Sequence, residues 1–342
     1  MAAVEMTARE GVLILAEVGS VHDGSYGNAG RLIAAAAQCG ADVVKFQTHI
    51  AEAETLYDAP MPPFFKGEPR FQYFQRTGFS LEQWRGLKAQ CEDLGVEFVS
   101  SPFSLEAVDL LERVGASRYK IPSGEVTNLP LLTAVAATGK PVILSSGMSS
   151  WAELDQAVET IGKGRSELTI LQCTSEYPCP YEQVGLNVML EMARRYGLPV
   201  GLSDHTLTSH ASIAAVTLGA TVIEKHFAFS RLMYGSDAAH SLEPREFAEL
   251  VRGIRAVETM LKSPVDKDRV ERYGEMKLVF QKSVVSLAPI AAGQVFKPEW
   301  LGIKKPGTGL PPARLTEIIG RRAARDIPAG RPLTAEDVEW ER

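Results

Sequence analysis

One pattern repeats eight times between residues 12 and 227: a short run rich in Val and Ile, followed by a segment with helical periodicity. Apolar runs that alternate with helical patterns are typical of parallel strands joined by helices. Eight such units in about 250 residues are what a (β/α)₈ TIM barrel requires. The runs are VLILAEVG (12–19), ADVVKFQ (41–47), EFVSSPF (97–103), RYKIPSG (118–124), PVILSSG (141–147), LTILQCT (168–174), VGLSDH (200–205) and TVIEKHF (221–227).

Helix start and stop signals lie between these runs. Ser80-Leu81-Glu82-Gln83 and Ser150-Trp151-Ala152-Glu153 fit the capping box that begins a helix. A doubly wound open sheet is the alternative fold, but it commonly carries GxGxxG in its first turn, and this chain does not. The barrel is therefore favoured. The glycines that could end a helix just before a run are Gly40, Gly95, Gly115, Gly139, Gly197 and Gly219.

Composition excludes several classes of protein. The chain has 342 residues and a formal net charge of −6, which argues against nucleic-acid or membrane-surface partners. No apolar run is long enough to span a bilayer, and the N-terminus lacks the pattern of a secretory signal. The four cysteines form no CxxC pair, so neither a zinc site nor a disulfide framework is indicated. We expect a cytoplasmic protein.

Polar side chains stand at the end of nearly every predicted strand. Active sites of TIM barrels gather at the carboxyl ends of the strands, so eight polar ends around one mouth predict a site there. In chain order these residues are Glu17; Lys45 and Gln47; Ser100 and Ser101; Lys120, Ser123 and Glu125; Ser145 and Ser146; Thr174 and Ser175; Ser203 and His205; Glu224 and His226.

Two lysines among these strand ends indicate the charge of a ligand. Lys45 and Lys120, surrounded by serine hydroxyls from neighbouring strands, suit a compact polyanion such as a phosphate ester. The alternative is structural, with one lysine paired to Glu17 or Glu125. Glu17 itself could orient a water or take a proton, or could serve only as the partner of Lys45.

Two histidines end consecutive strands. His205 and His226 could share a metal, because adjacent strands lie about 4.8 Å apart. Two imidazoles with oxygen ligands suit Mn²⁺ or Mg²⁺ better than a closed zinc site, although a strand-end histidine is often only a hydrogen-bonded core residue. His22 is a weaker candidate. We expect the other histidines in loops or helices: His49, His210 and His240.

Two further side chains near the sixth strand are ambiguous. Tyr177 could stack on a substrate or merely pack its loop. Cys173 reads as a strand residue that faces the core. No Ser-His-Asp site is indicated, because GxSxG is missing.

The tail of the chain follows another pattern. Ile290-Ala291-Ala292-Gly293 is followed by Glu299, and Ile327-Pro328-Ala329-Gly330 is followed by Glu336 at the same offset. This repeat of a turn and a strand predicts a small β-rich domain. We expect a catalytic barrel over 1–262, a linker over 263–282 and the small domain over 283–342.

The order of these motifs resembles the sialic acid synthase family. KFQT, GLSDHT and EKHF are specific in combination, and the resemblance covers residues 12–340. IKKPGTGL and RDIPAGRPLTAEDV resemble that family's C-terminal antifreeze-like domain, a β-clip fold called SAF. The motifs that carry the barrel resemblance are AEVGSVHDGS, VVKFQTHI, SSPF, YKIPSGE, ILSSGM, QCTSEYP, GLSDHT and IEKHF.

The resemblance implies a reaction. Enzymes of this family condense phosphoenolpyruvate with the open-chain aldehyde of an acetamido or diacetamido hexose, such as N-acetylmannosamine. The product is a nonulosonic acid of the sialic, legionaminic or pseudaminic type, and phosphate leaves by C–O cleavage. A divalent metal, Mn²⁺ or Mg²⁺, polarises the aldehyde oxygen. Family members are dimers in which the small domain of one subunit covers the barrel mouth of the other.

The motifs also imply a role for each strand end. Glu17 would manage water or a proton at the enolpyruvyl carbon, and His205 and His226 would hold the metal. The residues expected on phosphoenolpyruvate are Lys45, Gln47, Ser101, Lys120, Ser123, Ser145, Ser175 and Ser203. Those expected on the sugar are Glu125, Tyr177, Asp237 and, from the small domain, Lys305.

This chain departs from the family pattern at several positions, most of them on the sugar side. Val21 stands where the first loop usually has Asn, and Lys305 stands where the small domain usually offers Arg. Ser101 replaces a common Thr and Ser175 a common Asn. The aromatic-rich loop 60–73 is unlike the family's sugar-contacting loop. We therefore expect the phosphoenolpyruvate chemistry to be kept and the sugar acceptor to differ.

Two rival functions stay open at this point. A Schiff-base aldolase on the same barrel would use Lys120 or Lys225 and would need no metal. A sugar-binding module on an inactive barrel is the non-enzymatic alternative. Phosphoenolpyruvate aldolases of the heptulosonate and octulosonate type share the fold, but they do not explain the SAF-like tail.

Overall fold

The computed structural model describes residues 11–60 and 67–340. The chain divides into two compact units, residues 1–263 and 264–342. The expected linker over 263–282 stays a prediction, and part of that range forms the helix α11 (Gly274–Phe280).

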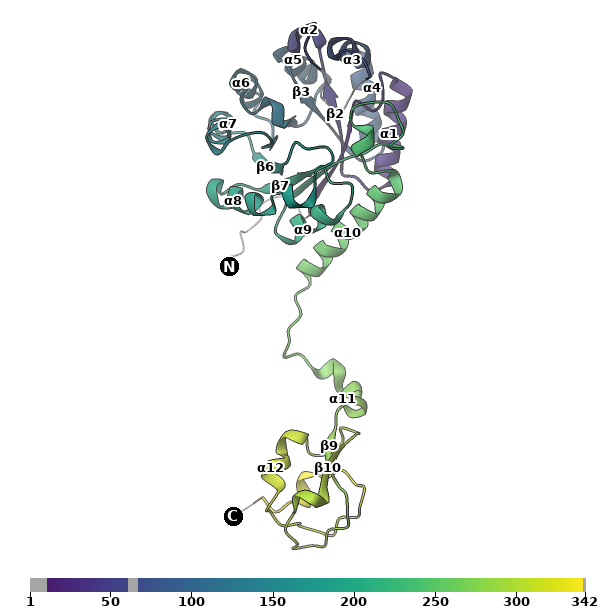
Figure 1. Cartoon of the computed structure of the whole chain (residues 1–342), viewed down its shortest axis with the longest axis vertical. Helices are drawn as coiled ribbons and strands as arrows, with labels where there is room; N and C mark the ends of the chain where they lie inside the picture. The colour runs from purple at the N-terminus through teal and green to yellow at the C-terminus, as the bar shows by residue number, and fades with distance from the viewer. Residues whose placement is uncertain (1–10, 61–66, 341–342) are drawn as a thin grey trace. The chain divides into compact units, whose positions relative to one another are not determined.

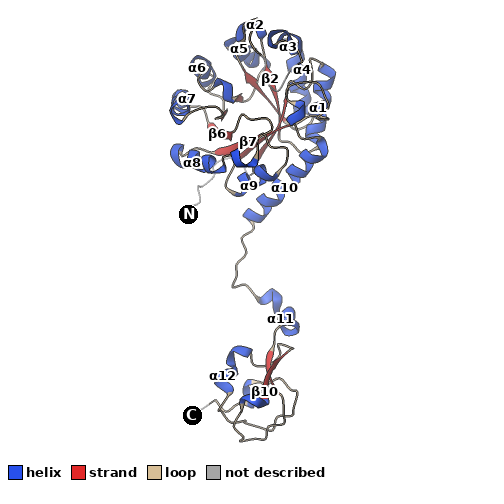
Figure 2. Ribbon diagram, viewed as in Figure 1, coloured by secondary structure: helices blue, strands red, loops and turns tan. Residues whose placement is uncertain are grey.

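The first unit is a closed parallel barrel of eight strands within the described residues, as predicted. Helices surround the strands (Figure 1), and the strands form the inner layer (Figure 2). All eight predicted runs are strands, although the fourth is shorter than expected. They are β1 (Leu13–Gly19), β2 (Val43–Thr48), β3 (Glu97–Pro102), β4 (Tyr119–Ile121), β5 (Val142–Ser145), β6 (Leu168–Cys173), β7 (Val200–Asp204) and β8 (Val222–His226).

Local sequence signals fix the helices between the strands. Both predicted capping boxes are present, at Ser80 with Gln83 and at Ser150 with Glu153. All six predicted helix-stop glycines have positive φ, a conformation that glycine adopts without steric cost. The helices are α1 (Tyr26–Gln38), α2 (Ala51–Glu54), α3 (Arg70–Thr77), α4 (Leu81–Asp93), α5 (Leu105–Val114), α6 (Leu129–Ala137), α7 (Trp151–Lys163), α8 (Leu186–Tyr196), α9 (His210–Thr217) and α10 (Pro244–Lys262).

The inside of the barrel has an apolar layer below a polar one. Successive side chains on a strand point to opposite faces, so the inward positions further along the same strands carry the predicted charged and hydroxyl groups. Glu17 pairs in register with Lys45 and with His226, which places these ends at one level. The apolar cluster consists of Leu13, Leu15, Val43, Val99, Ile143, Leu171 and Val222.

The second unit is small and its core is built across the predicted repeat. Ile290 and Ile327 exchange both backbone hydrogen bonds, at 2.9 and 2.8 Å. Gly293 and Gly330 have matching φ values of 78° and 79°, so the two halves form the same turn. The elements are α11, β9 (Ser283–Ser286), β10 (Leu301–Lys304), α12 (Leu315–Ile318) and the short helices η4 (Glu271–Tyr273), η5 (Pro298–Trp300), η6 (Pro312–Arg314) and η7 (Ala335–Asp337), with β9 and β10 antiparallel.

None of the helices over residues 11–60 and 67–340 has the length and apolar character needed to cross a bilayer.

Candidate active site

A buried network of four charged side chains lies at the centre of the polar layer. Lys45 Nζ lies 2.6 Å from Glu17 Oε2 and 3.8 Å from Glu224 Oε2. Lys120 Nζ lies 3.5 Å from Glu224 Oε1. All four side chains are buried. The structural pairing of Lys45 with Glu17, left open from the sequence, is therefore present.

The two lysines differ in their electrostatic balance. Burial alone would lower the pKa of Lys45, but Glu17 and Glu224 outweigh it and raise the pKa. For Lys120 burial dominates and lowers the pKa, with Glu224 opposing. Glu224 has a lowered pKa because the two lysines outweigh the effect of its burial. Lys45 is thus held in its charged form by two carboxylates, whereas Lys120 is less fully compensated, and an anionic ligand beside it would favour its charged form.

Hydroxyl groups line the wall beside Lys120. Lys120 Nζ donates to Ser145 Oγ at 2.7 Å, and Ser203 Oγ donates to Glu224 Oε1 at 2.9 Å. Ser101 Oγ, on β3, is buried and has no hydrogen-bond partner within the described part of the chain. An orphaned buried hydroxyl is costly, so this one is suited to an oxygen supplied by a ligand.

Next to these groups, the backbone of Gly147 lies close to the hydroxyls of Ser123 and Ser175. Gly147 N donates to Ser123 Oγ at 3.0 Å. A Cβ at Gly147 would collide with the hydroxyls of Ser175 and Ser123, so a residue without a side chain is required there. Two predicted serines, which follow β4 and β6, therefore gather around the glycine that follows β5.

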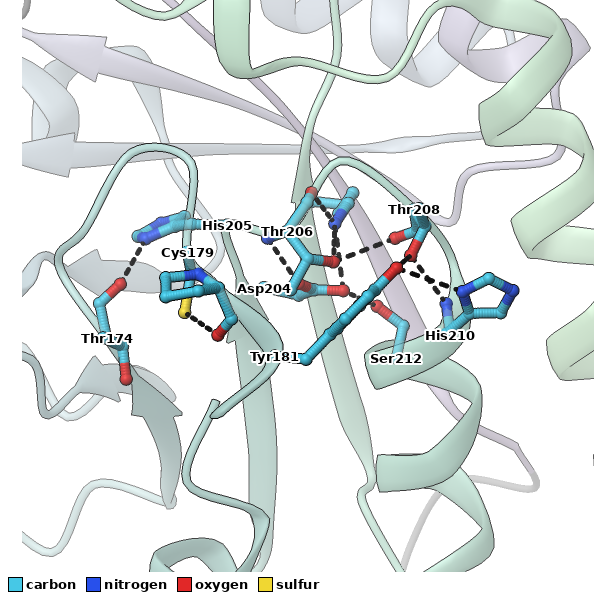
Figure 3. A network of polar contacts seen from close by, with 11 residues as sticks. Thr174, Cys179, Tyr181, Asp204, His205, Thr206, Thr208, His210 and Ser212 are labelled. Carbon is cyan, nitrogen blue, oxygen red and sulfur yellow. Dashed lines mark hydrogen bonds and ion pairs between the residues drawn. The ribbon is translucent and has the colours of Figure 1, made fainter. Parts of the chain in front are cut away.

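The predicted histidine pair lies close together and is ordered by its surroundings. The rings of His205 and His226 have centroids 5.4 Å apart, and Tyr177 stacks on His205 at 4.2 Å. His205 Nδ1 bonds the carbonyl of Thr174 at 2.8 Å, while the neighbouring Asp204 bonds Ser212 and Thr206 (Figure 3). Burial, and then His226, lowers the pKa of His205 to about 3, so its ring is neutral.

These histidines fit a divalent metal. A ligating imidazole must be neutral and is usually held through its other nitrogen, as the Thr174 carbonyl holds His205. His226 Nδ1 is buried without a hydrogen-bond partner among the described residues. The described chain contains no group of three or more His, Cys, Asp or Glu that could hold a metal. Two protein ligands would leave the remaining positions to water and substrate oxygens, as Mn²⁺ and Mg²⁺ accept.

The residues expected on the sugar lie on the loops above the strands. Glu125 ends the short helix η1 (Ser123–Glu125), accepts from Asn128 Nδ2 at 2.7 Å, and burial raises its pKa. Asp237 Oδ2 is buried with no hydrogen-bond partner in the described residues. A Cβ at Gly19 would collide with Asp237 and lie 3.2 Å from Gln47 Nε2, which places Asp237 beside Gln47.

Three contributors were missed by sequence reasoning. Glu224 was seen only as a polar strand end, although it lies two residues before His226 and so shares its face. Cys173 is a buried strand residue, as expected, but its contacts with Ser123 and Ser203 were not foreseen. His240 was expected only in a loop or helix; it ends η3 (Ala238–His240), and its ring lies 5.8 Å from that of Tyr177. No local sequence signal distinguishes His240.

The remaining residues that the sequence singled out are not part of the charged network or of the histidine pair. His22 is buried against Phe79, with ring centroids 4.6 Å apart. His210 begins α9 and bonds Tyr181. Lys225 points away from the barrel interior and pairs with Asp204 at 2.9 Å, which removes it as a Schiff-base lysine. Lys305 belongs to the second unit, where it lies over the ring of Phe280 at 5.1 Å. Of the aromatic loop 60–73, residues 61–66 lie outside the described residues.

The fold and the mouth together place this chain among TIM-barrel proteins with a charged, metal-compatible site inside the strand ends. The chain belongs to the NeuB family: residues 32–266 match that family, and residues 281–339 match the SAF domain. This confirms the resemblance and the two-part fold expected from the sequence.

Curated relatives cover nearly the whole chain. The N,N'-diacetyllegionaminic acid synthase of Campylobacter jejuni is 37% identical over 322 residues, which is 92% of this chain and 96% of that protein. The human N-acetylneuraminate-9-phosphate synthase is 34% identical over 316 residues, 90% of this chain and 88% of that protein.

A solved structure supports the same relation. The N-acetylneuraminic acid synthetase of Leptospira borgpetersenii, in complex with citrate, has a TM-score of 0.68 and 30% identity. The match covers 78% of this chain and 90% of that one. A 3-deoxy-D-arabino-heptulosonate 7-phosphate synthase from Thermotoga maritima, at 17% identity and a TM-score of 0.57, shares the fold alone.

Proposed function

We propose that this protein is a nonulosonic acid synthase, a C–C bond-forming transferase. It condenses phosphoenolpyruvate with an acetamido sugar and releases phosphate. The observation that carries the proposal is the arrangement of Lys120, hydrogen-bonded to Ser145, together with the paired rings of His205 and His226 inside one barrel mouth. The curated relatives named as legionaminic and N-acetylneuraminate-9-phosphate synthases support it.

Phosphoenolpyruvate binds in the lower part of the mouth. Lys120 supplies positive charge, and the orphaned Ser101 hydroxyl and the Ser123 and Ser175 hydroxyls around Gly147 supply donors for phosphate and carboxylate oxygens. Ser145 and Ser203 keep Lys120 and Glu224 in place. Because the pocket is buried, these contacts are stronger than they would be in water.

The bond-forming step joins C3 of phosphoenolpyruvate to the aldehyde carbon of the sugar. Water then adds at C2, and the bond between C2 and the phosphate oxygen breaks. Glu17, held by Lys45 and Gln47, orients that water or takes its proton. Glu125, Tyr177 and Asp237 contact the sugar.

His205 and His226 would hold a divalent metal, which would polarise the aldehyde oxygen. We propose Mn²⁺ or Mg²⁺ because two imidazoles with free positions for oxygen ligands suit these ions. The Thr174 carbonyl and the stacked Tyr177 ring orient His205 for this role.

The acceptor is proposed to be a legionaminate, pseudaminate or related nonulosonate precursor, including a spore-coat type of sugar. The departures at Val21 and Lys305 lie on the sugar side, and a lysine lacks the planar fork with which arginine binds an acyl oxygen. An acceptor competition assay tests this proposal. A wide preference for N-acetylmannosamine would rule it out.

The assembly is also a proposal. We infer a cytoplasmic homodimer in which the domain over 283–342 of one subunit brings Lys305 to the barrel mouth of the other, with residues 263–282 as the linker. Sedimentation of the full chain and of a chain ending at residue 282 tests this. A monomeric full chain with full activity would contradict it.

The first test of the activity is phosphate release from phosphoenolpyruvate with Mn²⁺, across a panel of acetamido sugars, with and without EDTA. Release that requires both sugar and metal is the expected result, and borohydride with substrate should trap no Schiff base. A folded protein that does not bind phosphoenolpyruvate would overturn the proposed function.

A further inference from the structure

A series of hydrogen bonds leads into the site from the loop after β2. It begins at Glu54 in α2, passes through His49 and Gln47, and ends at Glu17. The contacts are Glu54 Oε1 to His49 Nδ1 at 2.6 Å, His49 Nε2 to Gln47 Oε1 at 3.1 Å, and Gln47 Nε2 to Glu17 Oε1 at 2.7 Å.

The donor and acceptor of each hydrogen bond from Glu54 to Glu17 follow from which atoms carry hydrogens. Glu17 is bonded to a cation, Lys45, and its carboxylate oxygens can only accept, so the amide nitrogen of Gln47 must face it. The amide oxygen of Gln47 then faces His49, and an amide oxygen accepts only. His49 Nε2 must therefore carry a hydrogen.

The other nitrogen of His49 meets a carboxylate. Glu54 Oε2 accepts the backbone N–H of Ile50 at 3.2 Å, and Glu54 in its carboxylate form accepts at Oε1 as well. His49 Nδ1 must then donate as well, so the arrangement requires a proton on each ring nitrogen. The resulting imidazolium forms an ion pair with Glu54, and both side chains are only 5% exposed.

Two aromatic rings enclose this imidazole. Phe74 of α3 stacks on one face at 3.7 Å and Phe103 on the other at 4.1 Å, both nearly parallel to it. Flat aromatic faces attract a cation and exclude water from it. The two rings fix the plane of His49, and the hydrogen bonds to Glu54 and Gln47 fix its orientation within that plane.

We propose that His49, held by Glu54, is a positioning residue that keeps the amide nitrogen of Gln47 directed at Glu17. A neutral His49 could accept at Nε2, and Gln47 could then turn its oxygen toward Glu17 and repel the carboxylate. The inference deepens the proposed function, on which it rests for the role of Glu17. It assigns to the loop after β2 a task in the chemical step and not in substrate binding.

His49→Phe tests the proposal, because phenylalanine keeps the stack between Phe74 and Phe103 and removes both hydrogen bonds. We expect kcat to fall roughly 10- to 100-fold, the range typical of residues that orient a catalytic side chain without touching the substrate. The KM for phosphoenolpyruvate should stay within about threefold of the wild-type value. Phe74→Leu is the matched control: it loosens the stack, leaves the hydrogen bonds, and should change kcat by less than about threefold. Wild-type kcat in His49→Phe would overturn the proposal.

A spectroscopic readout separates this inference from the activity itself. In protein labelled with ¹⁵N-histidine, the His49 ring, assigned by its absence in His49→Phe, should show two N–H groups near neutral pH. Glu54→Gln keeps the shape of Glu54 and is the variant to use if His49→Phe does not fold. It should remove one of the two ring protons of His49 and reduce kcat. A ring with one N–H in the wild type would contradict the proposal even if phosphate release occurs. Two N–H groups without phosphate release would leave the orientation supported and overturn the proposed reaction.

Discussion

Two buried lysines lie on opposite faces of the same barrel wall. Lys45 points inward from β2, and Lys225 points outward from β8 toward the helices. Each contacts a carboxylate at short distance, Glu17 at 2.6 Å and Asp204 at 2.9 Å. By burial and by ion pairing they are alike.

They differ in what surrounds the ion pair. Asp204 and Lys225 are satisfied locally: Ser212 donates to Asp204 at 2.6 Å, and Lys225 donates to the Thr206 carbonyl. Around Lys45, Glu224 Oε2 has no hydrogen bond within the described residues and lies 3.8 Å from the ammonium, and Ser101 Oγ on β3 also has none. The polar groups of the outer pair are satisfied within the protein, so this pair serves the structure. The inner network has polar groups that a ligand could satisfy, and buried polar groups without partners are typical of functional sites.

The largest expected effect comes from breaking the outer pair. Lys225→Met leaves Asp204 buried and unpaired, so the free energy of unfolding should fall by about 3–5 kcal/mol, measured by urea denaturation. The folded fraction should still bind phosphoenolpyruvate. The double variant Asp204→Asn with Lys225→Met should recover much of the stability. A lasting loss of binding in the double variant would show that the pair serves the site directly.

The second effect concerns the inner face. Lys120→Met removes the cation that bonds Ser145, so kcat/KM for phosphoenolpyruvate should fall roughly 10²- to 10³-fold. Stability should change much less than in Lys225→Met, since Glu224 keeps Lys45. If activity survives with only a small change, the anion site is not at Lys120.

A third test removes the metal. EDTA should stop phosphate release, and added Mn²⁺ should restore it. His226→Asn should weaken Mn²⁺ binding at least about tenfold in calorimetric titration, while the fold is kept. His210→Asn, on α9, is the matched control and should bind Mn²⁺ as the wild type does. Equal weakening in both variants would exclude His226 as a ligand.

The smallest effect is a pH dependence of stability. Burial, and then His49, lowers the pKa of His22 to about 4, with Asp237 opposing, against about 6.5 in the unfolded chain. Between these values the unfolded state binds the extra proton, so the stabilisation is present above pH 6.5 and is lost as the pH falls toward 4.

His22→Asn should therefore reduce the slope of unfolding free energy against pH in this window by up to about 1.4 kcal/mol per pH unit. Urea denaturation at a series of pH values measures the slope. An unchanged slope would mean that His22 is not held neutral in the folded state.

The sequence by itself determined the barrel, its polar mouth and most of the residues gathered there. Strand periodicity, the capping boxes at Ser80 and Ser150 and the helix-stop glycines are local signals, and local backbone preference acts before any tertiary contact forms. The alternation of side chains along a strand then fixes which residues face inward, so Lys45 and His226 could be assigned to the mouth.

Only the tertiary structure decided which inward residues are paired and which remain available. Glu17 pairs with Lys45, while Lys120 donates to Ser145. The two lysines carry the same charge, so distances across the barrel decide which of them pairs with Glu17. His49 and His240 could not be placed from the sequence, since loops bring them to the site and no periodicity governs a loop. Coulomb energy and hydrogen bonding depend on separation in space, which strand order alone does not give.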